Sequence, residues 1–199
     1  MPAGTKLERG APLPKTERPI VFYGTSILQG GCASRPGMAY PALVGRILDY
    51  PTINLGFSGN ALSEPEMAEL LAELDPAVYV YDSLPNLNPS QVRERTEPFL
   101  RTLRKAHPRT PIVLIENVIY TNSDFVESRR VSAAEKNSAL LAIYKKLVAE
   151  GDKRLSYVKA PALLGDDGEA TVDGTHPTDL GFRRMADTIA PAIRKWLKH

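Results

Sequence analysis

Cysteine is almost absent from this chain, since Cys32 is the only one among its 199 residues. A single cysteine excludes an internal disulfide, so the fold does not depend on an oxidising compartment. It also excludes a structural metal centre built from several thiolates. A chain of this length is long enough to bury a stable core without disulfides or structural metal ions, and it is expected to form one domain.

Long apolar runs and an excess of charge are absent as well. No stretch approaches the ~18 apolar residues that a transmembrane helix needs, so we expect no membrane insertion. The 25 basic and 23 acidic residues leave a net charge of only +2, which indicates neither a nucleic-acid partner nor an anionic membrane surface. The N-terminus has no apolar core of a signal peptide. We therefore expect a soluble protein, with its compartment and oligomeric state left open.

Short apolar runs rich in β-branched residues alternate with segments of helical period. The runs typical of buried parallel strands are 19–23, 52–55, 77–81, 111–116 and, more weakly, 155–159. The segments with an apolar helical stripe are 35–48, 63–74, 88–106, 138–151 and a last one carrying Phe182 to Trp196. Ser63 with Glu66, and Asn88 with Gln91, have the spacing of N-terminal capping boxes. This alternation predicts a three-layer α/β/α domain with a parallel sheet over residues 19–199, preceded by an arm or linker over residues 1–18.

Three side chains with hydrolytic chemistry follow the predicted strands. Ser26 comes directly after the first strand in "YGTSILQGG", and Asp173 and His176 lie in "DGTHP" before the last helix. Ligands of open parallel sheets bind beyond the carboxyl ends of the strands, so these residues are expected at one edge. A nucleophilic serine, a histidine base and an aspartate that orients the histidine are what acyl transfer requires.

Each of these residues also has a simpler interpretation. Ser26 could be only a helix N-cap, and Asp173 could make an Asx-turn beside an incidental His176. Asp173, His176 and Asp179 could instead bind a metal ion as a D-x-x-H-x-x-D array. A phosphate-binding loop over residues 24–31 is disfavoured, because neither a P-loop nor a dinucleotide-binding pattern is present.

Amide donors follow the second and third predicted strands. Gly59 and Asn60 lie in "LGFSGN", and Asn86 lies in "DSLPN". Asn88 precedes Pro89 and is explained by a helix cap, which leaves Asn86 as the better side-chain donor to an oxyanion. The neighbouring Asp82 is either a structural acid at a strand end or a substrate contact, and the sequence does not separate the two.

These motifs together resemble the SGNH (GDSL-type) hydrolase family, here called the GDSL-like lipase/acylhydrolases. The resemblance covers residues 19–197 and rests on "YGTSI", "LGFSGN", "DSLPN" and "DGTH". It implies a flavodoxin-like five-stranded sheet, with Ser26, Asp173 and His176 as a catalytic triad. It also implies an oxyanion hole from Ser26, Gly59 and Asn86. Two departures are visible: the usual GDS is GTS, with Thr25 at the place of the aspartate, and the usual GxND block is SLPN.

The activity implied by the resemblance is hydrolysis of short-chain esters through an acyl-serine, without metal or cofactor. Acetyl groups on carbohydrates are the expected substrates, while aryl esters, thioesters and lysophospholipids stay open. Two alternatives remain: a catalytically silent carbohydrate-binding module on the same fold, and a metal-dependent hydrolase. Loss of activity in a Ser26→Ala variant, with and without a chelator, separates the three.

Overall fold

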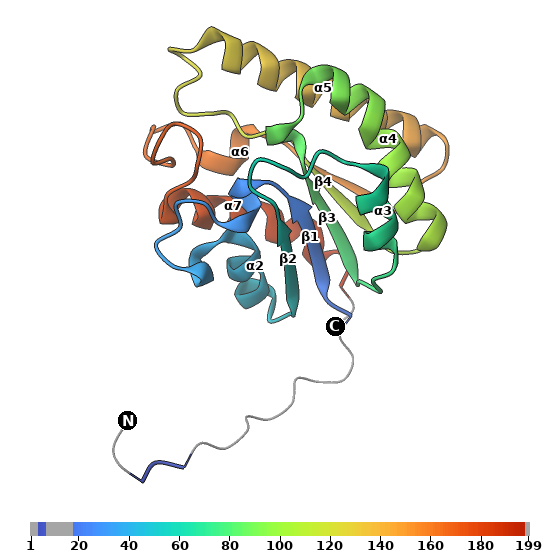
Figure 1. Ribbon diagram of the computed structural model, residues 1–199, viewed down its shortest axis with the longest axis horizontal. Coiled ribbons are helices and arrows are strands. Elements are labelled where there is room, and N and C mark those ends of the chain that lie inside the picture. Colours follow the sequence, from blue (N-terminus) through green and yellow to red (C-terminus); the bar gives the residue numbers. More distant parts are fainter. Residues whose placement is uncertain (1–3, 7–17, 198–199) are drawn as a thin grey trace.

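Five parallel strands form the single sheet of the computed structural model, which describes residues 4–6 and 18–197 (Figure 1). The strands are β1 (Ile20–Gly24), β2 (Thr52–Gly56), β3 (Val78–Asp82), β4 (Ile112–Ile115) and β5 (Leu155–Val158). Their order is β2-β1-β3-β4-β5, so the predicted flavodoxin-like topology is confirmed. All five strands begin and end within two residues of the predicted runs. Strands buried on both faces, such as β1, β3 and β4, form continuous apolar stretches in the sequence, whereas the edge strand β2 is only partly buried.

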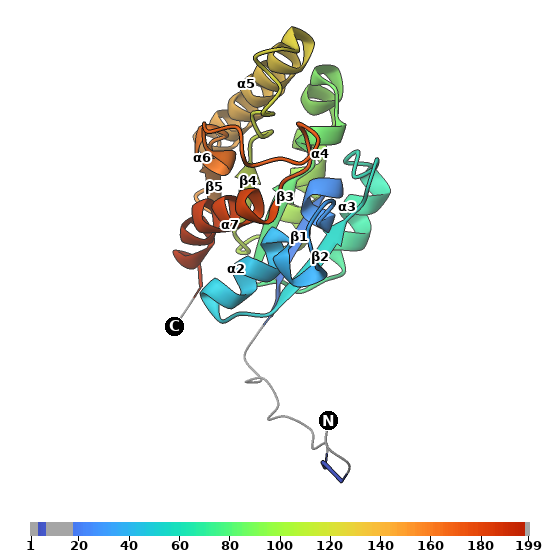
Figure 2. The same ribbon diagram turned by 90° about the vertical axis from the view of Figure 1, so that its left-hand side faces the viewer.

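Helices cover both faces of the sheet, as the two views at right angles show (Figures 1 and 2). One face packs against α1 (Ser26–Gln29), α2 (Tyr40–Leu48), α6 (Pro161–Leu164) and α7 (Asp179–Arg194). The other packs against α3 (Pro65–Ala72), α4 (Pro89–Ala106) and α5 (Glu127–Ala149). Two short 3₁₀ turns lie at Pro36–Met38 and Leu84–Asn86.

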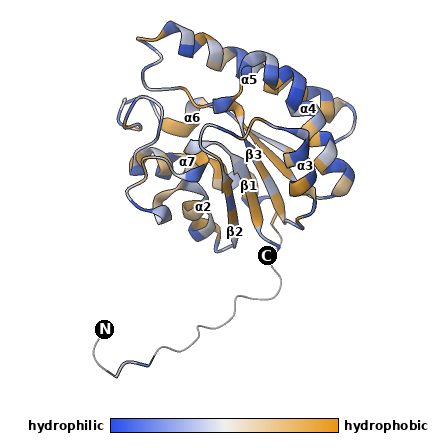
Figure 3. Cartoon of the chain, in the orientation of Figure 1, coloured by the Kyte–Doolittle hydropathy of each residue, from blue (hydrophilic) through white to orange (hydrophobic). Residues whose placement is uncertain are grey.

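The alternation of side chains along each strand divides the core in two. Ile20 and Phe22 of β1 point to the α2 and α7 side, whereas Val21 and Tyr23 point to the α3 and α4 side. Apolar residues are concentrated along the strands and the inner helix faces, and polar residues along the outer faces (Figure 3). Within the described residues, no helix has the length and apolar character needed to cross a membrane.

Two local predictions were wrong. The long helix α5 begins at Glu127, eleven residues before the apolar stripe that predicted it at residue 138. The capping box of Ser63 and Glu66 does not form, because α3 starts at Pro65 and the Ser63 hydroxyl instead lies 2.7 Å from the Tyr81 hydroxyl in the core. The predicted arm over residues 1–18 falls mostly outside the described residues.

Candidate active site

The candidate site lies where the strand order changes direction. β1 lies between β2 and β3, and the chain passes from β2 on one side of it to β3 on the other. The loops that leave the carboxyl ends of these three strands therefore diverge and open a crevice between them. They carry Ser26 after β1, Gly59 after β2 and Asn86 after β3.

Ser26 is the first residue of α1 rather than its N-cap. Thr25 caps this helix: its side-chain oxygen accepts from the N–H of Ile27, and Thr25 is fully buried. The hydroxyl of Ser26 is therefore not needed for capping and points instead to His176. This arrangement also explains why a threonine can stand at position 25 in place of the family's usual aspartate, since a short hydrogen-bonding side chain at that position caps the helix.

His176 reaches Ser26 from a loop folded back on itself. Val172 N–H donates to the His176 carbonyl and Thr178 N–H to the Ala170 carbonyl, each at 2.9 Å, and Thr178 then caps α7. These bonds hold the loop at the sheet edge. The Nε2 atom of His176 lies 2.9 Å from the Ser26 Oγ, although 150 residues separate the two in sequence.

Asp173 holds the other side of the imidazole. Its Oδ2 lies 2.7 Å from Nδ1 of His176, and its Oδ1 accepts from the backbone N–H groups of Thr175 and His176 at 2.9 and 2.7 Å. Burial alone would raise the pKa of Asp173, but these hydrogen bonds outweigh it and hold the pKa well below its ordinary value. Gly174, at φ +82°, makes the tight turn that lets one carboxylate bind all three donors.

Gly31 leaves room for the imidazole. A Cβ atom on Gly31 would lie 3.1 Å from Cδ2 of His176 and 3.1 Å from the Ser26 carbonyl oxygen. Both contacts are tighter than carbon atoms normally accept, so a side chain here would push the histidine away from the serine. The glycine flank of Ser26 thus shapes the site through its lack of volume.

The amide groups that follow β2 and β3 differ in their positions and partners. Gly59, at φ +70°, and Asn86 both line the crevice with Ser26, and the Asn86 Nδ2 donates to the Asn60 carbonyl at 2.7 Å. The Asn60 side chain donates to the Ser58 carbonyl within its own loop. Asn88 forms the predicted capping box with Gln91, which confirms its structural role.

Asp82 does not reach the crevice. It is 1% exposed and accepts from the Tyr40 hydroxyl at 2.7 Å. Burial raises the pKa of Asp82 to about 7, against which the hydrogen bond from Tyr40 acts only in part. The structure therefore favours the structural acid over the substrate contact.

The residues of the D-x-x-H-x-x-D array do not gather as a metal site. Both carboxylate oxygens of Asp179 bind Ser34, accepting from its N–H at 3.0 Å and from its hydroxyl at 2.5 Å. In the described part of the chain, the ligand atoms that lie within 4.8 Å of one another belong to Cys32, Asp173 and His176. Both nitrogens of His176 already face Ser26 and Asp173, so a metal ion would have to displace one of these partners.

The crevice is an open cavity of about 570 Å³. Ser26 and His176 line it, and the loops after β2, β3 and β4 contribute Gly59, Asn86 and Tyr120. The N-terminal part of α5 completes the lining. It contributes four residues that were not among the predicted site residues, Ser128, Arg129, Ser132 and Lys136, and the unpredicted Tyr120 and Thr175 line the cavity as well. Helix propensity without an apolar stripe was the only signal for this segment.

The chain belongs to the GDSL-like lipase/acylhydrolase family, whose sequence profile matches residues 17–194. A crystal structure of a protein described as a GDSL-like lipase from Bacteroides ovatus is similar at 45% identity and a TM-score of 0.86, over 90% of this chain and 53% of that one. The predicted family is confirmed. None of the curated proteins compared with the sequence matches it significantly.

Two more distant structures share the fold. The salicylyl-acyltransferase SsfX3 from a tetracycline biosynthetic pathway has 20% identity and a TM-score of 0.78, over 92% of this chain and 56% of that one. A family two carbohydrate esterase from Clostridium thermocellum, in complex with cellohexaose, has 18% identity and a TM-score of 0.70, over 95% and 68%. The chain spans just over half the length of the first two structures that it matches.

Proposed function

We propose that the protein is a serine esterase in which Ser26 is the nucleophile, His176 the general base and Asp173 the residue that orients the base. The observation that carries the proposal is the unbroken series of hydrogen-bond distances from Asp173 through His176 to Ser26, which ends in an open cavity. Family membership agrees with this chemistry. No step requires a metal ion or an organic cofactor.

In the acylation step, the Ser26 Oγ attacks the ester carbonyl carbon while Nε2 of His176 takes the hydroxyl proton. The imidazolium that forms is stabilised by Asp173, whose carboxylate accepts from Nδ1–H. The tetrahedral intermediate then collapses, the bond to the leaving alcohol breaks, and His176 protonates the departing oxygen. In deacylation, a water molecule attacks the acyl-serine by the same proton transfers in reverse.

The developing oxyanion would be bound by the N–H groups of Ser26 and Gly59 and by the side-chain amide of Asn86. These groups border the same cavity as the nucleophile. Fixed donors around a developing charge cost no reorganisation during the reaction, and losing one typically costs about 3–4 kcal/mol of transition-state stabilisation.

The proposed substrates are short-chain acyl esters, with acetyl groups on carbohydrates first. The cavity is open, so the structure offers room for a bulky alcohol such as a sugar. The fold is shared with a carbohydrate esterase crystallised with an oligosaccharide, which supports the same class of alcohol here.

The direct test is hydrolysis of p-nitrophenyl acetate by the wild type and by Ser26→Ala, each with and without EDTA. We expect activity that EDTA leaves unchanged and that falls by about 10³-fold or more in the variant. Equal rates in the two proteins would reject Ser26 as the nucleophile. Loss of activity with EDTA would favour the metal-dependent alternative, and inactivity on all acetyl esters would favour the silent binding module.

A further inference from the structure

The part of the cavity lining that α5 contributes forms a cationic wall. Arg129, Ser132 and Lys136 are spaced three and four residues apart on α5, so they form one stripe along the helix, and all three line the cavity. Among the described residues that line it, none is acidic. The wall therefore presents two positive charges, at the two ends of a stripe two helical turns long, with no negative charge beside them.

Lys136 is the more informative of the two cations. The residue is only 6% exposed, and its Nζ donates to the Pro85 carbonyl at 3.2 Å. Burial lowers the pKa of Lys136 to about 8, so the amine still carries its proton at pH 7. In the described chain, no carboxylate lies within 4 Å of this ammonium group. A buried cation without a counter-charge is costly, and that cost is expected to be offset by something the cavity receives.

Arg129 is only partly buried, but it resembles Lys136 in having no carboxylate beside it. Its guanidinium donates to the Thr175 hydroxyl, next to His176, and lies over the Tyr120 ring at 5.2 Å from the ring centre. Here too, no carboxylate of the described residues is within ion-pair distance. The aromatic ring and the hydroxyl fix the guanidinium without neutralising it, which leaves the charge available to a ligand.

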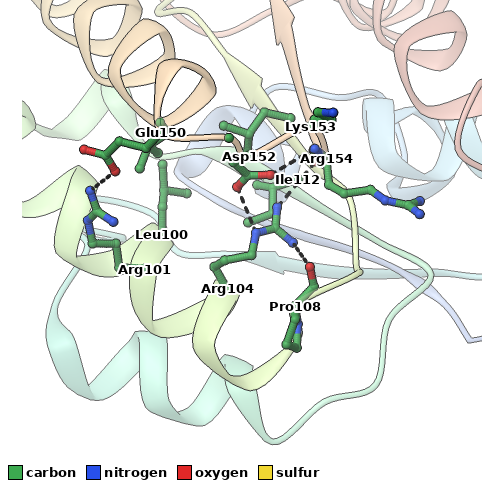
Figure 4. A pocket seen from close by; sticks show the side chains of 12 residues that line it. Leu100, Arg101, Arg104, Pro108, Ile112, Glu150, Asp152, Lys153 and Arg154 are labelled. Atoms are coloured by element: carbon green, nitrogen blue, oxygen red, sulfur yellow. Dashed lines mark hydrogen bonds and ion pairs between the residues drawn. The ribbon is translucent and has the colours of Figure 1, made fainter.

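A smaller cavity with a different lining provides an internal comparison. It measures about 410 Å³ and lies at the amino ends of β4 and β5 (Figure 4). Two of its four cations are paired, Arg101 with Glu150 at 2.5 Å and Arg104 with Asp152 at 2.9 Å, whereas Lys153 and Arg154 form no ion pair with the described residues. The acidic residues of that lining thus pair with the arginines beside them, whereas the lining of the Ser26 cavity contains no acidic residue that could pair with Arg129 or Lys136.

We infer that the ester substrate carries a carboxylate, which Arg129 and Lys136 bind while Ser26 attacks the ester. The inference rests on the proposed function and narrows its substrate class. The carboxylate can belong to the alcohol, as in an acetylated uronic acid, or to the acyl group, as in a half-ester of a dicarboxylic acid. Both place one negative charge opposite the same two cations.

The same contacts suggest a purely structural role, which the test has to separate. Lys136 binds the loop that carries Asn86, and Arg129 binds the residue beside His176. If positioning were their only role, neutral replacements would slow neutral and charged esters by the same factor. If they bind the carboxylate, the ratio of kcat/KM for the charged ester to that for its neutral partner falls.

The experiment measures this ratio with two matched pairs of esters. The acyl pair is mono-p-nitrophenyl glutarate with p-nitrophenyl pentanoate, and the alcohol pair is an acetylated methyl glucuronoside with the matching methyl glucoside. The wild type is expected to prefer the charged member of one pair by about tenfold or more, and Arg129→Gln and Lys136→Met each to reduce that preference several-fold. The pair that shows the preference identifies the part of the substrate that carries the carboxylate.

Arg130→Gln is the control, because Arg130 is exposed on the same helix, pairs with Glu127 at 3.2 Å and does not line the cavity. Its ratios should equal those of the wild type. Hydrolysis of neutral esters with no preference in either pair would overturn the inference and leave the proposed esterase standing. Absence of all hydrolysis would reject the esterase itself. In that case, calorimetric titration of Ser26→Ala with glucuronate and with glucose tests the cationic wall alone, and equal binding of the two would reject it.

Discussion

The side-chain amide of Asn86 donates to the backbone carbonyl of Asn60 at 2.7 Å, and this bond ties the loop after β3 to the loop after β2. One N–H of the amide is used in this contact, the amide has a second N–H, and Asn86 lines the cavity. The bond therefore fixes the orientation of a donor on which the proposed oxyanion hole depends. Such fixation matters because a donor must be in place before charge develops.

Replacing Asn86 by alanine is expected to lower kcat on p-nitrophenyl acetate by about 10²- to 10³-fold, with a much smaller change in KM. The reason is that the amide would bind the transition state more strongly than the ground state. Asn88→Ala is the matched control, since Asn88 caps α4 and is expected to cost about 1 kcal/mol of stability with little change in kcat. Equal kinetic losses in the two variants would argue against an oxyanion role for Asn86.

Asp173→Asn is expected to lower kcat by about 10³- to 10⁴-fold while the protein stays folded. An amide opposite Nδ1 can donate a proton there, which favours the tautomer with a proton on Nε2, the atom that faces Ser26. Such a histidine cannot accept the serine proton. Activity measured beside Asp179→Asn, whose carboxylate binds Ser34 instead, provides the comparison, and that control should remain within a few-fold of wild type. A larger loss in the control would revive the metal-binding array.

The site residues on the loops could be predicted because short local sequence motifs identify them. The carboxyl ends of parallel strands lie at one edge of the sheet, so the sequence alone predicts Ser26 and Asn86 at that edge. The three-residue spacing of Asp173 and His176 requires only a local turn, which Gly174 makes. The cationic wall could not be foreseen in this way, because its residues meet the site only through the packing of a distant helix.

The first residues of α5 show why the cationic wall could not be predicted from the sequence. Residues 127–137 read "ESRRVSAAEKN", which contains good helix formers but no apolar stripe. Their inner face borders a polar cavity rather than the core, so hydrophobic periodicity carries no signal there. The prediction of a capping box at Ser63 was wrong for a related reason. Its spacing to Glu66 satisfies the capping rule, but its hydroxyl lies within the core beside Tyr81. Tertiary contacts override local rules where a polar side chain finds a better partner.

Gly31→Ala is expected to slow the enzyme without removing any catalytic group. The added methyl would lie 3.1 Å from the imidazole carbon Cδ2, so His176 has to shift by a few tenths of an ångström from Ser26. Because a displacement of 1 Å can cost about 10²-fold, we expect kcat to fall by about 3- to 10-fold. Gly37→Ala makes only an ordinary contact, at 3.7 Å from Arg46, and should leave kcat unchanged. If both variants keep wild-type rates, the fit of His176 against Gly31 does not matter for catalysis.

Asp82 predicts how the stability of the fold depends on pH. Its pKa is raised by burial to about 7, whereas an unfolded chain ionises near its ordinary value of 3.8. Between these two values the folded protein holds a proton that the unfolded chain has released. The free energy of unfolding therefore falls as pH rises through this range, and the contribution of this group is largest below pH 4 and lost above pH 7.

Integrated over the window from pH 5 to pH 8, this single group lowers the free energy of unfolding by roughly 2–3 kcal/mol. Asp82→Asn keeps an acceptor for the Tyr40 hydroxyl but has no proton to release, so its stability should fall less over the same range. Urea unfolding of both proteins at the two pH values measures the difference directly. The carboxylates of Asp167 and Asp173, whose pKa values are lowered, contribute fully above pH 5 and cancel in this comparison. Parallel curves for the two proteins would show that Asp82 ionises inside the fold at little cost, and that the core around Tyr40 is more polar than its burial indicates.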